Sequence, residues 1–238
     1  MNITKKLLPL SMVASILIFT ACGGDSTSDG GTPPSQTEIK TVDQAKSNFQ
    51  ALSVSNSFDG LGNALDNDNQ KTTFNKTTTH QCTSGSLSIT EEGSTFSFVA
   101  DKCRIANYYI DGSISEVELS DGSTKMSMSN LTMKDGEIEM TSTQLLFVEN
   151  ENDHWLTMDG DMKIVSKCFS GTYNLETVEK IYEAQDGSDN AESGILKLNG
   201  VTYTFDNPHV TIKTATEEET ILQSELEKQM SNTTTCSE

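Results

Sequence analysis

Basic side chains are scarce in this 238-residue chain: 16 lysines and arginines stand against 35 aspartates and glutamates, a formal net charge of −19. Nucleic acids and anionic membrane surfaces repel such a chain, so neither is an expected partner, whereas cations and basic proteins are attracted to it. Aromatic residues are also few, at 6%, and apolar residues make up only 34%. We therefore expect a thin hydrophobic core.

The sequence also lacks the motifs that carry common catalytic chemistry. It has no Gly-x-Ser-x-Gly elbow, no His-Glu-x-x-His pair, no glycine-rich phosphate loop and no Cys-x-x-Cys. Its three histidines, His80, His154 and His209, each lie beside a predicted strand end or turn, where an imidazole is usually solvated. We expect no enzyme activity, no catalytic residue, no cofactor and no metal.

The N-terminus carries an export signal. Lys5 and Lys6 precede an apolar run over residues 7–19, which is too short to span a bilayer but has the order of a secretory signal peptide. The stretch Phe19-Thr20-Ala21-Cys22 resembles a bacterial lipobox. This resemblance implies that Cys22 is acylated and becomes the mature N-terminus, anchoring the chain to a membrane. The alternative is an ordinary signal peptide, with Cys22 a spare thiol.

The residues after Cys22 suggest both the cellular location and the domain boundaries. Bacterial lipoproteins with Asp directly after the acylated cysteine are typically kept in the inner membrane, so Gly23 implies the outer membrane, facing the periplasm or the cell surface. Residues 22–40 are rich in glycine, serine and acid, and predict a flexible tether. We therefore expect a signal peptide at 1–21, the tether at 22–40 and a single β-rich domain at 41–238.

Helices are predicted at both ends of the domain. Val42, Ala45, Phe49 and Leu52 share one helix face over 42–53, with Thr41 as N-cap; a second short helix is expected at 58–65. Near the C-terminus, Thr216 and Glu219 form a capping box. The apolar positions of that expected helix are Ile221, Leu222, Leu226 and Met230.

Six X-Gly dipeptides separate alternating runs of apolar and polar residues from residue 82 onward. Such dipeptides favour two-residue hairpin turns, because both central residues of a type I′ turn need positive φ. The pattern predicts a mainly β fold, an antiparallel meander of about ten strands reaching residue 214, as a curved sheet or open barrel with one wet serine- and threonine-rich face. The dipeptides are Glu92-Gly93, Asp111-Gly112, Asp121-Gly122, Asp135-Gly136, Asp159-Gly160 and Asn199-Gly200.

These turns also predict which residues face each other across neighbouring strands. The predicted pairs are Leu198 with Val201, Leu196 with Tyr203, Met133 with Ile138, Leu131 with Met140, Lys134 with Glu137, and Val117 with Met126.

Four cysteines remain after Cys22, and an even number in an exported chain favours two disulfides with three possible connectivities. A two-residue turn at Glu92-Gly93 sets Leu87 opposite Phe98 and Cys82 opposite Cys103, with Cα atoms about 4.5 Å apart. The predicted bridges are thus Cys82–Cys103, on the sheet face opposite Leu87 and Phe98, and by elimination Cys168–Cys236.

The sequence offers possible ligands for calcium and for copper, but both sets of residues have simpler explanations. Acidic clusters at residues 66–70, 159–161 and 186–190 offer oxygens for calcium, but hairpin turns use the same residues. Six methionines offer thioethers for copper, but core filling explains them equally well. These are Met126, Met128, Met133, Met140, Met158 and Met162, with His154-Trp155 nearby in sequence.

Two functions follow from these observations. The first is a membrane-tethered cell-envelope lipoprotein with a structural or protein-binding role, whose partner would be another envelope protein of unknown identity. The second is a periplasmic carrier of an apolar ligand, because an N-terminal helix before a long meander is similar in element order to the half-barrel carriers LolA and LolB. An apolar concave face with open volume would favour the carrier, and a filled core would favour the first function.

Overall fold

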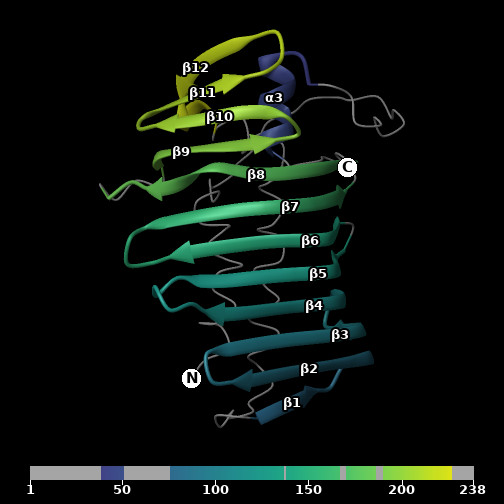
Figure 1. Cartoon of the computed structure of the whole chain (residues 1–238). Coiled ribbons are helices and arrows are strands. Elements are labelled where there is room, and N and C mark those ends of the chain that lie inside the picture. Colours follow the sequence, from purple (N-terminus) through teal and green to yellow (C-terminus); the bar gives the residue numbers. More distant parts are fainter. Residues whose placement is uncertain (1–38, 51–75, 137, 167–169, 186–189, 227–238) are drawn as a thin grey trace.

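The computed structural model describes residues 39–50, 76–136, 138–166, 170–185 and 190–226 (Figure 1). In these ranges one helix, α3 (Val42–Gln50), precedes twelve strands in a single antiparallel sheet. The strands are β1 (Lys76–His80), β2 (Ser84–Glu92), β3 (Thr95–Ile105), β4 (Tyr108–Glu118), β5 (Thr124–Asp135), β6 (Ile138–Asn150), β7 (Trp155–Val165), β8 (Ser170–Glu183), β9 (Ala191–Leu198), β10 (Val201–Asp206), β11 (His209–Lys213) and β12 (Glu218–Leu222).

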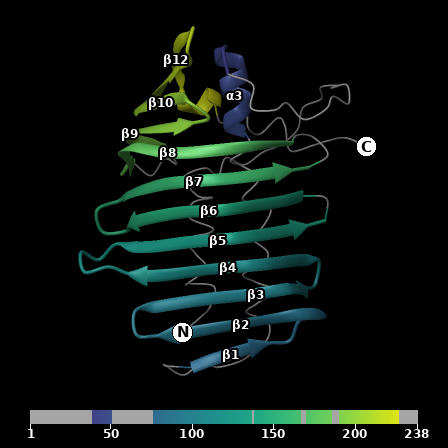
Figure 2. The same cartoon turned by 45° about the vertical axis from the view of Figure 1, so that its right-hand side comes forward.

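The predicted meander is confirmed, because strand order in the sheet is the order in the chain. The sheet is open: β1 and β12 are its two edges and do not pair with each other. In Figures 1 and 2 the strands are stacked in sequence, and α3 lies beside the β9–β12 end. The two edge strands extend the sheet beyond the expected range of residues 82–214.

The hairpin at Asn199-Gly200 forms as predicted, with Leu198 opposite Val201 and Leu196 opposite Tyr203. Two other hairpins, β2–β3 and β5–β6, turn one residue later than expected. In the β5–β6 hairpin, Asp135 pairs with Ile138 and Lys134 with Glu139, so β5 continues through Asp135 and does not turn there. Met133 therefore faces Met140 and not Ile138. The predicted pairing of Val117 with Met126 is also wrong, because a five-residue connection between β4 and β5 sets Val117 opposite Lys125.

Two of the Asp-Gly dipeptides lie inside strands and not at turns. Gly112 in β4 and Gly160 in β7 have φ values of 115° and 135°, and the pairing of both strands is interrupted there. A side chain at Gly112 would collide with the carbonyl of Asn130, and one at Gly160 with the carbonyl of Gln144. Glycine is therefore needed because a bulged neighbouring strand approaches closely, and the turn predictions at these sites are wrong.

The C-terminal capping box is wrong. Residues 218–222 form the edge strand β12, and the expected C-terminal helix is present but begins only after this strand, at Gln223. Thr216 precedes β12, and its hydroxyl donates a hydrogen bond to the Lys40 carbonyl (2.6 Å). Ile221 and Leu226 are buried as expected, but Leu222 is exposed because strand alternation places it on the other side from Ile221. The expected helix position Met230 lies outside the described residues.

The N-terminal helix follows its predicted pattern as far as it is described. Thr41 caps it: the Gln44 amide donates to the Thr41 hydroxyl (3.3 Å) and the Ala45 amide to the Thr41 carbonyl (3.1 Å). Val42, Ala45 and Phe49 are buried against the sheet. Residues 51–53 and the expected second helix at 58–65 lie outside the described residues.

One face of the sheet, here called the inner face, carries the hydrophobic core. Alternate residues of the strands are buried there in a single cluster that also contains the buried residues of α3. The outer face carries mostly polar side chains of intermediate exposure, as expected for a half-solvated antiparallel sheet. No helix among the described residues is long and apolar enough to cross a membrane.

Candidate functional site

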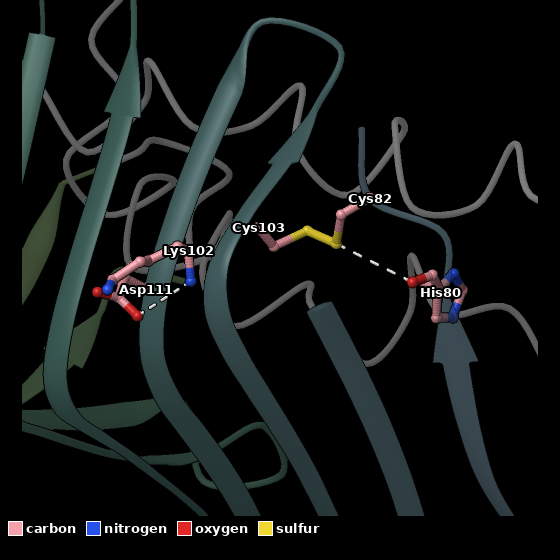
Figure 3. The surroundings of a disulfide bond; sticks show 5 residues. All are labelled: His80, Cys82, Lys102, Cys103 and Asp111. Carbon is pink, nitrogen blue, oxygen red and sulfur yellow. Dashed lines mark hydrogen bonds between the residues drawn. A yellow bond between two sulfur atoms is a disulfide. The ribbon is translucent and has the colours of Figure 1, made fainter. Parts of the chain in front are cut away.

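A disulfide joins Cys82 to Cys103, as predicted (Figure 3). Their Cα atoms are 5.4 Å apart, within the range that a disulfide requires. Cys103 is fully buried in β3, and Cys82, in the connection between β1 and β2, packs against the core. The sulfur of Cys82 lies 4.0 Å from the carbonyl oxygen of His80. This is a packing contact, because a disulfide sulfur carries no proton to donate.

The register that predicted this bond is wrong, although the bond is present. The β2–β3 turn consists of residues 93 and 94, so Leu87 lies opposite Ala100 and not Phe98. Cys82 lies outside β2, and it meets Cys103 from a connection that folds back between His80 and Ser84. The bond is therefore not a pair within the strand ladder.

The bond also lies on the inner face, where Leu87 and Phe98 are buried, and not on the opposite face as we expected. Inward-facing residues of β3 are even-numbered as far as Ala100. A bulge that includes Lys102 (φ 50°) then changes the alternation, so that Cys103 faces inward. The amide of Lys102 is held by the carboxylate of Asp111 on β4, at 3.2 Å (Figure 3).

The remaining cysteine predictions lie outside the described residues. This applies to the lipid attachment at Cys22 and to the bridge Cys168–Cys236. Both stay predictions.

The aspartates of the suspected calcium loop at residues 159–161 bind backbone amides. Asp159 accepts a hydrogen bond from the amide of Thr177 (3.0 Å), and Asp161 accepts one from the amide of Thr143 (3.3 Å). Both amides lie at irregularities of the neighbouring strands β8 and β6. In the described ranges no three His, Cys, Asp or Glu side chains are close enough to hold a metal ion. Residues 66–70 and 186–189 lie outside those ranges.

The methionines considered for copper fill the core. All six are buried on the inner face, among leucine, isoleucine and phenylalanine side chains. His154 lies in the β6–β7 turn, with Nδ1 at 3.5 Å from the Glu183 carboxylate. His80 differs from expectation, because its imidazole is buried at the end of β1 and not solvated.

Trp155 is the most enclosed aromatic residue of the outer face. Its neighbour Leu156 belongs to the core, so Trp155 points to the opposite side, where Lys180 Nζ lies 3.3 Å from the ring centroid. Asn150, its partner on β6, donates a 3.5 Å hydrogen bond to the Asp121 carbonyl and accepts bonds from the amides of the β6–β7 turn. These bonds tie the β4–β5 connection to the start of β7.

An acidic cluster on the inner face was missed at the sequence level. Glu149 follows Leu145 and Phe147 at alternate positions of β6, so it points inward at the end of the strand. Burial, and then the negative charges of Glu151, Glu116 and Glu183, raise the pKa of the Glu149 carboxyl to about 7. Strand alternation alone would have located Glu149, had its charge not suggested an exposed position.

The inner face has the leucine, isoleucine, methionine and phenylalanine lining expected of an apolar-ligand carrier. Its core side chains are buried and contact one another in a single cluster. Comparison of the chain with protein-family models, with curated proteins and with solved structures gives no match.

Proposed function

We propose that this protein is a lipid-anchored component of the bacterial cell envelope with a structural or protein-binding role. The observation that carries most weight is the Cys82–Cys103 disulfide, because such bonds persist in oxidising compartments and are rare in the cytosol. It agrees with the export signal at residues 1–21 and with the lipobox-like stretch ending at Cys22. Acylation of Cys22 would attach the chain to the outer membrane, facing the periplasm or the cell surface.

The structural or binding role is favoured over the carrier by the packing of apolar side chains on the inner face. A carrier needs an apolar cavity into which a ligand can enter, whereas the Leu, Ile, Met and Phe side chains here pack against each other. A sheet with a packed inner face and a polar outer face is better suited to binding another protein at its surface than to enclosing a ligand. The acidity of the chain favours a basic partner in the envelope.

Metabolic labelling with palmitate tests the anchor. The wild-type protein should be labelled and should sediment with outer-membrane vesicles on a density gradient, whereas Cys22→Ser should lose both properties. Ser26→Ala, four residues further along the proposed tether, is the matched control and should keep both. Unlabelled wild-type protein, or Cys22→Ser that stays in the membrane fraction, would contradict the proposal.

A further inference from the structure

At the β6–β7 end of the sheet, the carboxylate of Glu149 occupies an inward-facing strand position that is usually apolar. Glu149 lies on the inner face, half-buried, two residues after Phe147. The strand register sets it between Thr124 of β5 and Leu156 of β7. Directly opposed side chains on one face have Cβ atoms about 4.5–5.5 Å apart. Thr124 and Leu156 are therefore the nearest cross-strand neighbours, and neither carries a positive charge.

Three further acids lie at the same end of the sheet, and their negative charges act on Glu149. Glu116 of β4 is opposite Met126, which in turn is opposite Phe147, so Glu116 faces inward as well. Glu183 ends β8, where its amide donates to the His154 carbonyl (2.9 Å) and its carboxylate lies 3.5 Å from His154 Nδ1. Glu151 follows β6 in the turn. These four glutamates are here called the carboxylate cluster.

The strand register places no other described charged side chain directly opposite Glu149. Glu118, opposite Thr124, and Asp153, in the turn, are exposed and add negative charge. Lys125 is opposite Val148 on the outer face, and Lys180 lies over the Trp155 ring on that same face. His154 lies in the turn, with Nδ1 at 3.5 Å from the Glu183 carboxylate.

We propose that the carboxylate cluster is a proton-responsive device: with a proton on Glu149 the β6–β7 end of the sheet is closed, and loss of that proton loosens it. The protonated carboxyl is neutral and fits between Thr124 and Leu156. The ionised form must be desolvated beside Glu116, Glu151 and Glu183, and opening the hairpin returns it to water.

The direction of the pH dependence follows from where the proton binds more tightly. Glu149 in the closed sheet holds its proton up to a pKa of about 7, against an ordinary glutamate value of 4.5. The closed state is therefore most stable in acid and loses stability as the pH rises through 7. With these two values, the equilibrium constant for opening grows about tenfold between pH 6 and pH 8.5.

Native-state hydrogen exchange on the full-length protein tests the device. After correction for the intrinsic base-catalysed rate, the amides of residues 147–158 should exchange about tenfold faster at pH 8.5 than at pH 6 in the wild type. Glu149→Gln, which keeps the neutral form at every pH, should abolish this increase. Glu139→Gln, on the same strand but paired with Lys134 (2.8 Å), is the matched control and should retain it.

Two further measurements separate Glu149 from its neighbours and from folding failure. His154→Gln should leave the increase in place, which excludes the imidazole as its source. Carbon-13 NMR of the glutamate carboxyls in the wild type should show one group titrating near neutral pH. A Glu149 carboxyl that titrates below pH 5, or an increase that persists in Glu149→Gln, would overturn the proposal.

Discussion

The hydroxyl of Tyr203 on β10 donates a 2.7 Å hydrogen bond to the carbonyl of Ala45 in α3, across 158 positions of the chain. Both residues are fully buried, and the Tyr203 ring lies 4.9 Å from that of Phe49. Burial raises the pKa of the Tyr203 hydroxyl, which therefore remains a donor at physiological pH. This contact fixes where the helix sits on the sheet.

Tyr203→Phe should lower the free energy of unfolding by about 1 kcal/mol, because it removes one buried hydrogen bond and keeps the ring packing. Urea denaturation followed by circular dichroism measures the change. Tyr182→Phe is the control, since Tyr182 is 40% exposed on the outer face, and it should be neutral. Equal stability of the two variants would show that the Tyr203–Ala45 bond does not hold the helix.

The strand glycines give a second prediction. Gly160→Ala places a Cβ 2.9 Å from the Leu145 Cα, at a φ of 135°, and should cost more than about 3 kcal/mol or prevent folding. Gly93→Ala, at a turn with nothing within 4 Å of the added Cβ, should cost only about 1 kcal/mol. Similar melting temperatures for both variants would contradict the bulge at Gly160.

These glycines also show which parts of the fold could be predicted from the sequence. Alternating apolar residues and X-Gly dipeptides were enough to predict an antiparallel meander and the pairing at Asn199-Gly200. An Asp-Gly dipeptide, however, fits a turn and a bulge equally well, because both need a residue of positive φ. Asp111-Gly112 and Asp159-Gly160 lie inside strands, where bulges of the neighbouring strands β5 and β6 approach them closely. That approach is a tertiary contact, which no local pattern encodes.

The predicted start of the C-terminal helix was wrong for a similar reason. The residues Glu218 to Leu222 satisfy helix spacing and a capping box, yet β11 offers an unpaired edge directly beside them. Pairing with that edge satisfies the backbone, and the Thr211–Thr220 hydroxyl contact (2.8 Å) adds to it. At the β6–β7 end of the sheet, strand alternation points Glu149 inward, but its charge suggested an exposed position.

The disulfide gives a third prediction. Replacing Cys82 and Cys103 together by alanine should lower the free energy of unfolding by about 3 kcal/mol, because the bond closes a loop of 21 residues in the unfolded chain. The comparison is with wild-type protein under oxidising conditions, and reduction of the wild type should produce a loss of the same order. Equal stability of oxidised and reduced wild-type protein would refute a structural role for the bond.

Peptide mapping without reduction checks the second bridge. Cys82 and Cys103 are joined, so if Cys22 is acylated as proposed, Cys168 and Cys236 have only each other as partners within the chain. Digestion of the exported protein should release one linked peptide pair containing them. Free thiols at both positions, or a link between separate chains, would refute this prediction.

Calcium should not stabilise the protein. The carboxylates of Asp159 and Asp161 already accept hydrogen bonds from the amides of Thr177 and Thr143, so a cation would have to displace these bonds and release the two bulges. A specific site with a Kd near about 10 μM would add roughly 3 kcal/mol at a hundredfold excess of calcium. Differential scanning calorimetry at millimolar calcium, with magnesium at equal ionic strength as control, should show the same melting temperature in both. A rise with calcium alone that Asp159→Asn abolishes would place a calcium site at residues 159–161, whereas a rise that survives this substitution would place the site elsewhere in the chain.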